Sequence, residues 1–153
     1  MIRSLLVLSI GVGLALTLPA SASDITTIDV RKTATCGCCS AWIGHLQKNG
    51  FKVQAANMPF SVLARFKSTH GISPKLASCH TGRVGGYIIE GHVPTREIKR
   101  LLEERPNAIG LSVPGMPIGS PGMESGTYRD AYDVLLIKKD GSTEIYAHYP
   151  AQG

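Results

Sequence analysis

Three of the four cysteines in this chain lie within one tetrapeptide, Cys36-Gly37-Cys38-Cys39. The packing of a small protein does not require thiols at that density, so the tetrapeptide predicts a functional site. The fourth cysteine, Cys79, directly precedes His80. A fold that brings Cys79 to the tetrapeptide would gather the sulfur atoms of all four cysteines at one place, where they could bind soft metal or exchange disulfides.

Strand and helix patterns alternate around the tetrapeptide. Ile25–Val30 alternates apolar and polar side chains, as a short strand does. A helix is predicted from Cys39 to the stop at Asn49-Gly50, because its apolar residues recur with helical spacing. The later segments predicted are a strand at Phe51–Ala55, a short helix at Pro59–Lys67, a loop at Ser73–Gly82, a strand at Val84–Glu90 interrupted by Gly85-Gly86, and a helix opened by Pro94 and closed by Pro106.

The last third of the chain combines a long loop with a hairpin pattern. Gly110–Met123 carries three prolines and four glycines in 14 residues, and its apolar residues favour an ordered flap. Tyr132–Ile137 and Thr143–His148 flank Asp140-Gly141, which is typical of a tight hairpin turn. The element order predicts an α/β fold, namely a thioredoxin-like mixed sheet flanked by helices with a C-terminal β-hairpin. An unrelated small α/β sandwich is the alternative.

The N-terminus has the pattern of a cleaved signal peptide. Arg3 is followed by an apolar run of about 14 residues and by Ala20-Ser21-Ala22, a small-residue cleavage site. We therefore predict a signal peptide at residues 1–22 and a single domain at residues 23–153. The apolar run is shorter than the roughly 20 residues that span a bilayer, so no membrane span is expected.

The charge pattern argues against nucleic acid as a partner. The formal net charge is +5 at pH 7, but basic side chains alternate with acidic ones, as between Arg96 and Glu104. Such alternation is typical of a solvated surface and not of a stripe that follows phosphates. Aromatic residues are few and are not interleaved with the basic ones.

The spacing of the cysteines leaves several chemistries open. Cys36 and Cys39 form a Cys-x-x-Cys, the redox pair of a thiol-disulfide oxidoreductase. If the cysteines were only structural, Cys36–Cys39 and Cys38–Cys79 would be the relaxed pairs. A third neighbouring thiol would interfere with simple disulfide exchange, whereas it adds a bridging ligand for Cu(I). Four thiolates also suit zinc, but three ligands within four residues favour several copper ions over one tetrahedral zinc.

Methionine and histidine side chains could add ligands. Met116 and Met123 offer thioethers on the flexible loop, although packing is the more common role of methionine. His80 is the best imidazole candidate because it adjoins Cys79. His45 lies at least one helical turn beyond the cysteines, and the remaining histidines are predicted to be surface or strand residues: His70, His92 and His148.

Five linked motifs resemble the CopG-type family of exported copper-resistance proteins. The match follows the chain in order over nearly all of its mature part. It rests on Thr35-Cys36-Gly37-Cys38-Cys39, Leu76-Ala77-Ser78-Cys79-His80-Thr81, Val84-Gly85-Gly86-Tyr87, Glu90-Gly91-His92-Val93-Pro94 and Val113–Glu124. This family, formerly a domain of unknown function, is associated with bacterial copper resistance. The resemblance implies a thioredoxin-like fold that binds copper through Cys36, Cys38, Cys39 and Cys79. The chain departs from the expected pattern at Asn57-Met58, where we would expect Asp-Met.

The function expected from these observations is that of a periplasmic copper-binding protein. It would hold Cu(I), with several ions per chain in a cysteine-bridged cluster, for copper resistance or homeostasis. The alternative is a periplasmic thiol-disulfide or copper oxidoreductase that uses Cys36 and Cys39, so enzyme activity stays an open question. A third possibility is exchange of copper with another exported copper-handling protein that docks at the methionine loop.

Overall fold

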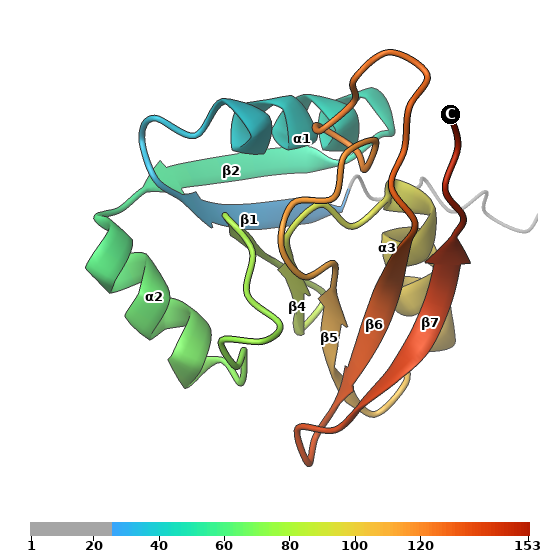
Figure 1. The fold of residues 1–153 in the computed structure, drawn as a ribbon. Coiled ribbons are helices and arrows are strands. Elements are labelled where there is room, and N and C mark those ends of the chain that lie inside the picture. The colour runs from blue at the N-terminus through green and yellow to red at the C-terminus, as the bar shows by residue number, and fades with distance from the viewer. Residues whose placement is uncertain (1–25) are drawn as a thin grey trace, which may run out of the picture.

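A computed structural model describes residues 26–153, and the predicted signal peptide lies outside these residues. The seven strands form one mixed sheet in the order β2-β1-β3-β4-β5-β6-β7 (Figure 1). Strand β2 is parallel to β1 and β5 is parallel to β4, while the other neighbours are antiparallel. The elements are β1 (Thr27–Lys32), α1 (Gly37–Lys48), β2 (Lys52–Asn57), α2 (Phe60–Thr69), β3 (Thr81–Val84), β4 (Tyr87–Glu90), α3 (Thr95–Glu104), β5 (Ala108–Ser112), β6 (Tyr132–Lys138) and β7 (Thr143–Tyr149).

Helix α1 follows β1 after a short loop and presents its N-terminus at the end of that strand. Cys36 is the N-cap residue, and its sulfur accepts a hydrogen bond from Cys39 N at 3.3 Å. Cys39, Trp42 and Leu46 form the buried face of the helix, which confirms the helical spacing read from the sequence. Gly50, at a φ of +92°, lets the chain turn into β2.

Strands β3 and β4 replace the single interrupted strand predicted at Val84–Glu90, so that prediction is wrong. Gly85 and Gly86 have φ values of +54° and +86°, and two consecutive residues with positive φ make a two-residue hairpin turn. The glycine pair therefore reverses the chain. The resulting register pairs Thr81 with Glu90, and continuing it by two residues places Cys79 opposite His92.

Strand β5 was also missed, because the predicted loop began at Gly110 and the structure has a strand there. Gly110 lies so close to β4 that an added Cβ would be 1.8 Å from Ile88 O. Glycine is thus required for strand packing at this position, although in a sequence it is typical of a loop. The real loop begins at Val113 and returns to the sheet at β6.

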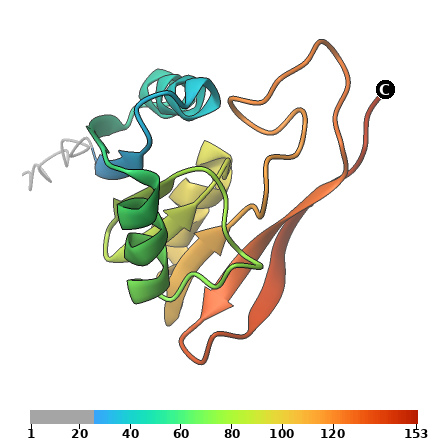
Figure 2. The ribbon, with the colours of Figure 1, turned by 60° about the vertical axis from the view of Figure 1, so that its left-hand side comes forward.

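The helices lie on both faces of the sheet (Figures 1 and 2). Helices α1 and α3 contribute Trp42, Leu46, Ile98 and Leu101 to the larger apolar core on one face. A smaller cluster packs Ile72, Leu76, Ile88 and Ile137 together. It lies on the other face, because Ile88 and its β4 neighbour Ile89, which belongs to the larger core, point to opposite sides of the sheet. Within residues 26–153 we find no helix that is long and apolar enough to cross a bilayer.

Candidate metal centre

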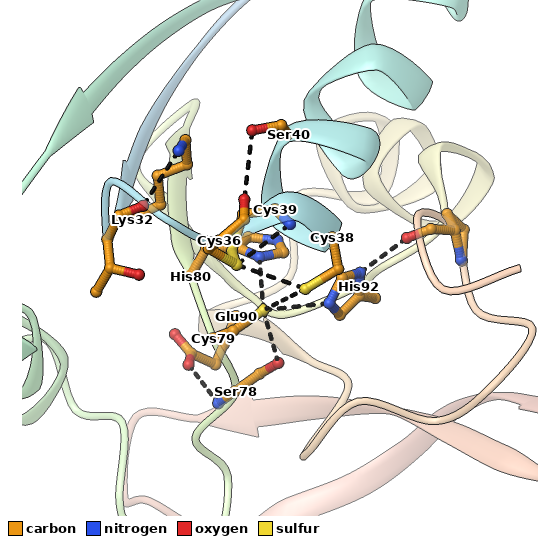
Figure 3. The surroundings of a disulfide bond; sticks show 12 residues. Lys32, Cys36, Cys38, Cys39, Ser40, Ser78, Cys79, His80, Glu90 and His92 are labelled. Atoms are coloured by element: carbon orange, nitrogen blue, oxygen red, sulfur yellow. Dashed lines mark hydrogen bonds between the residues drawn. A yellow bond between two sulfur atoms is a disulfide. The ribbon is translucent and has the colours of Figure 1, made fainter.

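The first half of the site is the cysteine loop, Cys36–Cys39, at the N-terminus of α1 (Figure 3). Cys36 and Cys39 form a disulfide, with their Cα atoms 5.4 Å apart, and Cys38 is a free thiol. Unpaired backbone N–H groups and the positive end of the helix dipole stabilise thiolates at such a place. Reduction of the disulfide would add the thiols of Cys36 and Cys39 to that of Cys38, all at the start of the helix.

The second half is supplied by the segments that lead into and out of the β3–β4 hairpin: Cys79 and His80 directly precede β3, and His92 follows β4. The sulfur of Cys79 lies 3.8 Å from Cys38 Sγ, and Cys38 Sγ lies 3.4 Å from Cys36 Sγ. All four cysteine sulfurs are within 4.8 Å of one another. The fold thus brings together the two cysteine segments that are far apart in the sequence.

His92 is the residue that the sequence interpretation missed, since it was assigned to the surface or to a strand. The side chain is fully buried, and its Nδ1 is 2.8 Å from Pro121 O. A carbonyl oxygen can only accept, so Nδ1 carries the proton and Nε2 has a free lone pair. That Nε2 is 3.2 Å from Cys79 Sγ, where it can accept from the thiol or bind a metal.

His80 lies between aromatic rings beside the same sulfur. Its Nδ1 is 3.2 Å from Cys79 Sγ, and the ring centroid is 4.3 Å from that of Trp42 and 4.9 Å from that of His92. Its Nε2 is buried and finds no hydrogen-bond partner among the described residues. Burial, the nearby His92 and the charge of Lys67 lower the pKa of His80 well below its usual value, so the ring is neutral at pH 7.

The second half of the site is uncharged at neutral pH. Burial, followed by the neighbouring Cys38 thiol, raises the pKa of Cys79 to about 12. Burial also lowers the pKa of His92, although the hydrogen bond to Pro121 opposes that shift. A soft metal ion that binds here must displace the thiol proton, and it would meet imidazole nitrogens that already have free lone pairs.

The two methionines predicted as additional ligands, Met116 and Met123, lie in the loop between β5 and β6. Met116 is 52% exposed and Met123 is half-buried. This loop lies against α1, because a Cβ on Gly122 would be 2.7 Å from Trp42 N and 2.9 Å from Cys38 O. It therefore covers the start of the helix, and ligation by either methionine stays a prediction.

Three histidines have partners of their own. Thr95 N donates to His45 Nε2 at 3.2 Å. His70 packs its ring on that of Phe66 with centroids 4.1 Å apart. His148 pairs with Asp133 at 2.7 Å on the exposed side of β6 and β7. These contacts agree with the prediction that His70 and His148 lie outside the site. The same prediction for His92 does not agree with its contact to Cys79.

Two solved structures resemble the chain over most of its length. One, named "Copper resistance protein copG- Form 1", is 44% identical with a TM-score of 0.78, and the match covers 83% of this chain and 99% of the other. The second, "Copper resistance protein copG- Form 2", is 44% identical with a TM-score of 0.77, covering 83% of this chain and 100% of the other. This chain belongs to the CopG family of copper resistance proteins. The family model described as "Protein of unknown function, DUF411" matches residues 76–123, and no curated protein matches the chain.

Membership in the CopG family and the gathered cysteines together support a copper-related function. The donor set suits copper as the bound ion, because thiolate sulfur and imidazole nitrogen are both good ligands for it. The buried His80 Nε2 without a partner is a further sign of fit, since buried polar atoms normally have one. The part of the sequence that matches the DUF411 family model includes His80 and His92 as well as Cys79.

Proposed function

We propose that this chain is a periplasmic protein that holds Cu(I) in a thiolate cluster formed by Cys36, Cys38, Cys39 and Cys79. The observation that carries the proposal is that all four cysteine sulfurs lie within 4.8 Å of one another. The fold achieves this although Cys38 and Cys79 are 41 positions apart in the sequence. Thiolates bridge soft cations, so sulfurs at this spacing would hold more than one Cu(I). His92 Nε2 would be an additional ligand.

Anaerobic titration of the reduced chain with Cu(I), followed by native mass spectrometry, tests this proposal. We expect more than one copper per chain. A matched titration with Zn²⁺ is the control, because four thiolates could also form one closed zinc site. A chain that binds no copper, or one zinc in preference to copper, would contradict the proposal.

The topology supports a thioredoxin-like assignment for the N-terminal part of the sheet. Strands β1 and β2 are parallel and joined through α1. Strand β3 is antiparallel to β1, and β4 is antiparallel to β3 and is followed by α3. Strands β5, β6 and β7 extend this unit, and the antiparallel pairing of β6 with β7 supports the C-terminal hairpin. One continuous sheet supports a single domain at residues 23–153.

Export to the periplasm belongs to the proposal as well, since the signal peptide pattern lies in residues 1–22. The mass of the protein recovered from the periplasm of an expressing Gram-negative host would test it. Cleavage after Ala22 should leave a chain that begins at Ser23. Recovery of the uncleaved chain from the cytosol alone would contradict export.

The disulfide in the cysteine loop favours a second candidate function, a copper or thiol oxidoreductase. Cys38 Sγ lies 3.4 Å from Cys36 Sγ of the Cys36–Cys39 bond. Two Cu(I) ions that each give up one electron would supply the two electrons that convert this disulfide to two thiolates, and they would leave as two Cu(II). A thiol-disulfide enzyme would keep disulfide-reductase activity in a Cys38→Ser variant, whereas a cluster protein would lose copper stoichiometry.

Copper exchange with another exported copper-handling protein would use the loop between β5 and β6. Met116 is exposed at 52%, and a thioether is a soft ligand that could accept Cu(I) on its way to the cysteines. A Met116→Leu variant should then load more slowly from a Cu(I)-carrying donor protein but reach the same final stoichiometry. Equal loading rates would contradict this role.

A further inference from the structure

Glu90 and Lys67 form a buried ion pair next to the cysteine cluster. Glu90, at the end of β4, is fully buried, and the Lys67 side chain in α2 is 9% exposed, with Nζ 2.5 Å from Oε1. The attraction within such a pair is largely offset by the desolvation of both charges, so an apolar pair often stabilises a fold as well. The specific contacts of this pair therefore call for an explanation other than stability.

The carboxylate of Glu90 is held on both oxygens. Oε1 accepts from Lys67 Nζ and, at 2.7 Å, from Ser78 N, the amide one residue before Cys79 (Figure 3). Oε2 accepts from Thr81 Oγ1 at 2.6 Å, and Thr81 Oγ1 in turn accepts from Lys67 Nζ at 2.9 Å. The carboxylate consequently cannot rotate away from Ser78 without losing several hydrogen bonds.

Ser78 is fixed from its other side as well. Its hydroxyl donates to Gly115 O, in the loop that also carries Pro121, the partner of His92. Gly91 makes this approach possible, because a Cβ there would be 2.6 Å from Ser78 Cβ and 2.5 Å from Val113 O. The backbone that leads into Cys79 is thus clamped between the end of β4 and the covering loop.

We propose that Glu90 is a positioning residue, which holds Cys79 in the metal centre through the hydrogen bond to Ser78 N. Lys67 neutralises the carboxylate so that it can remain buried at this place. The inference rests on the proposed function, since it concerns the geometry of one ligand of the same site. Loss of a partner that orients a ligand from the outer shell typically weakens metal binding about 10- to 100-fold.

Two double variants isolate this hydrogen bond without leaving an unpaired buried charge. Lys67→Met with Glu90→Gln removes both charges but keeps an oxygen that accepts from Ser78 N, and the Gln amide can donate to Thr81. Lys67→Met with Glu90→Met removes the acceptor as well, with a side chain of similar length. The affinity of each reduced protein for Cu(I) is measured by competition with a chromophoric Cu(I) chelator.

We expect the Met/Met variant to bind Cu(I) about 10-fold more weakly than the Met/Gln variant. In a Cys79→Ser background the same two proteins should agree within about twofold, as independent changes do. Equal affinities in the presence of Cys79 would overturn the proposal. A difference that persists without Cys79 would also overturn it, because Glu90 would then act on the fold in general.

Amide exchange of Ser78 separates this inference from the proposed function. In the copper-free chain, we expect the Ser78 N–H to exchange slowly in the parent and in the Met/Gln variant, and about 10-fold faster in the Met/Met variant. A parent chain that binds no Cu(I) would contradict the proposed function, and the exchange rates would still decide whether Glu90 holds this segment. Equal exchange in all three proteins would overturn the positioning role.

Discussion

The cysteine loop at the start of α1 and the β3–β4 half of the site lie face to face, but they are built in different ways. The cysteine loop depends on local contacts, such as Cys39 N to Cys36 Sγ and Ser40 Oγ to Cys36 O. In the β3–β4 half, His80 and His92 are fully buried. The polar contact of His92 reaches Pro121, 29 positions away in the sequence.

This difference separates chemistry from geometry within one site. Once its disulfide is reduced, the cysteine loop supplies three thiols at a helix N-terminus, and such a position favours reactive sulfur. The β3–β4 half supplies one sulfur and two neutral imidazoles, and their positions depend on a hairpin register, a buried ion pair and a covering loop. We therefore expect changes in the cysteine loop to lower the number of copper ions bound. Changes in the β3–β4 half should lower the affinity for copper.

The largest effect should come from removing the thiols of the cysteine loop. A Cys36→Ser, Cys38→Ser, Cys39→Ser triple variant should lose multiple-copper binding entirely, because Cys79 alone cannot bridge several ions. Native mass spectrometry after anaerobic Cu(I) titration measures this. More than one copper bound to the triple variant would mean that the β3–β4 half, and not the cysteine loop, provides the main capacity.

Removing Cys79 should have a smaller effect, on the coupling of metal binding to stability. Cu(I) at 100 times its dissociation constant should stabilise the reduced parent chain by about 2.7 kcal/mol through mass action. The Cys79→Ser variant should gain much less, because its site loses the only sulfur ligand from the second segment and so joins the two segments more weakly. The increase in melting temperature on adding Cu(I) measures both, and equal increases would show that Cys79 is not a ligand.

The cysteine loop was easier to predict from sequence than the β3–β4 half, because its contacts are local and those of the β3–β4 half are long-range. The thiol density and the helical spacing of Cys39, Trp42 and Leu46 are local, so the cysteine loop and α1 were predicted correctly. His92 was missed because its partner Cys79 is assigned only after the hairpin register is known. Gly85-Gly86 was the available signal: interpreted as a two-residue turn, it places position 79 opposite position 92.

The rest of the fold was predictable to the extent that each element had its own pattern. The mixed α/β class came from the alternation of strand and helix patterns along the chain. Strand β5 was hidden because Gly110, which is required for close approach to Ile88, is a residue typical of loops. The Lys67–Glu90 pair was hidden too, since charged residues are normally expected on the surface and nothing local shows that these two are buried.

A His92→Asn variant tests the imidazole contribution of the β3–β4 half. The Asn amide can still donate to Pro121 O in place of Nδ1–H, but no nitrogen lone pair faces Cys79. We expect Cu(I) affinity to fall by about 10-fold or more, while the free energy of unfolding of the copper-free protein changes by about 1 kcal/mol. His148→Asn, at an exposed histidine, is the control, and equal affinities of the two variants would exclude His92 as a ligand.

The smallest effects are expected on stability, when one glycine in each half is replaced by alanine. The free energy of unfolding should fall for the glycine in the β3–β4 half and rise for the one in the cysteine loop. Gly86 is at φ +86° in the β3–β4 turn with open space around it, so Gly86→Ala meets only backbone strain, worth about 1–2 kcal/mol of lost stability.

Gly37 begins α1, and an added Cβ there also meets nothing within 4 Å. Because its φ is not positive, Gly37→Ala should stabilise the protein by about 0.4–1 kcal/mol through a less flexible unfolded chain. Urea unfolding of both variants gives the two signs, and Gly86→Asn, which tolerates positive φ better than alanine, should lie between Gly86→Ala and the parent. If Gly86→Ala were as stable as the parent, the positive φ at this position would not strain alanine and the turn would not depend on glycine there.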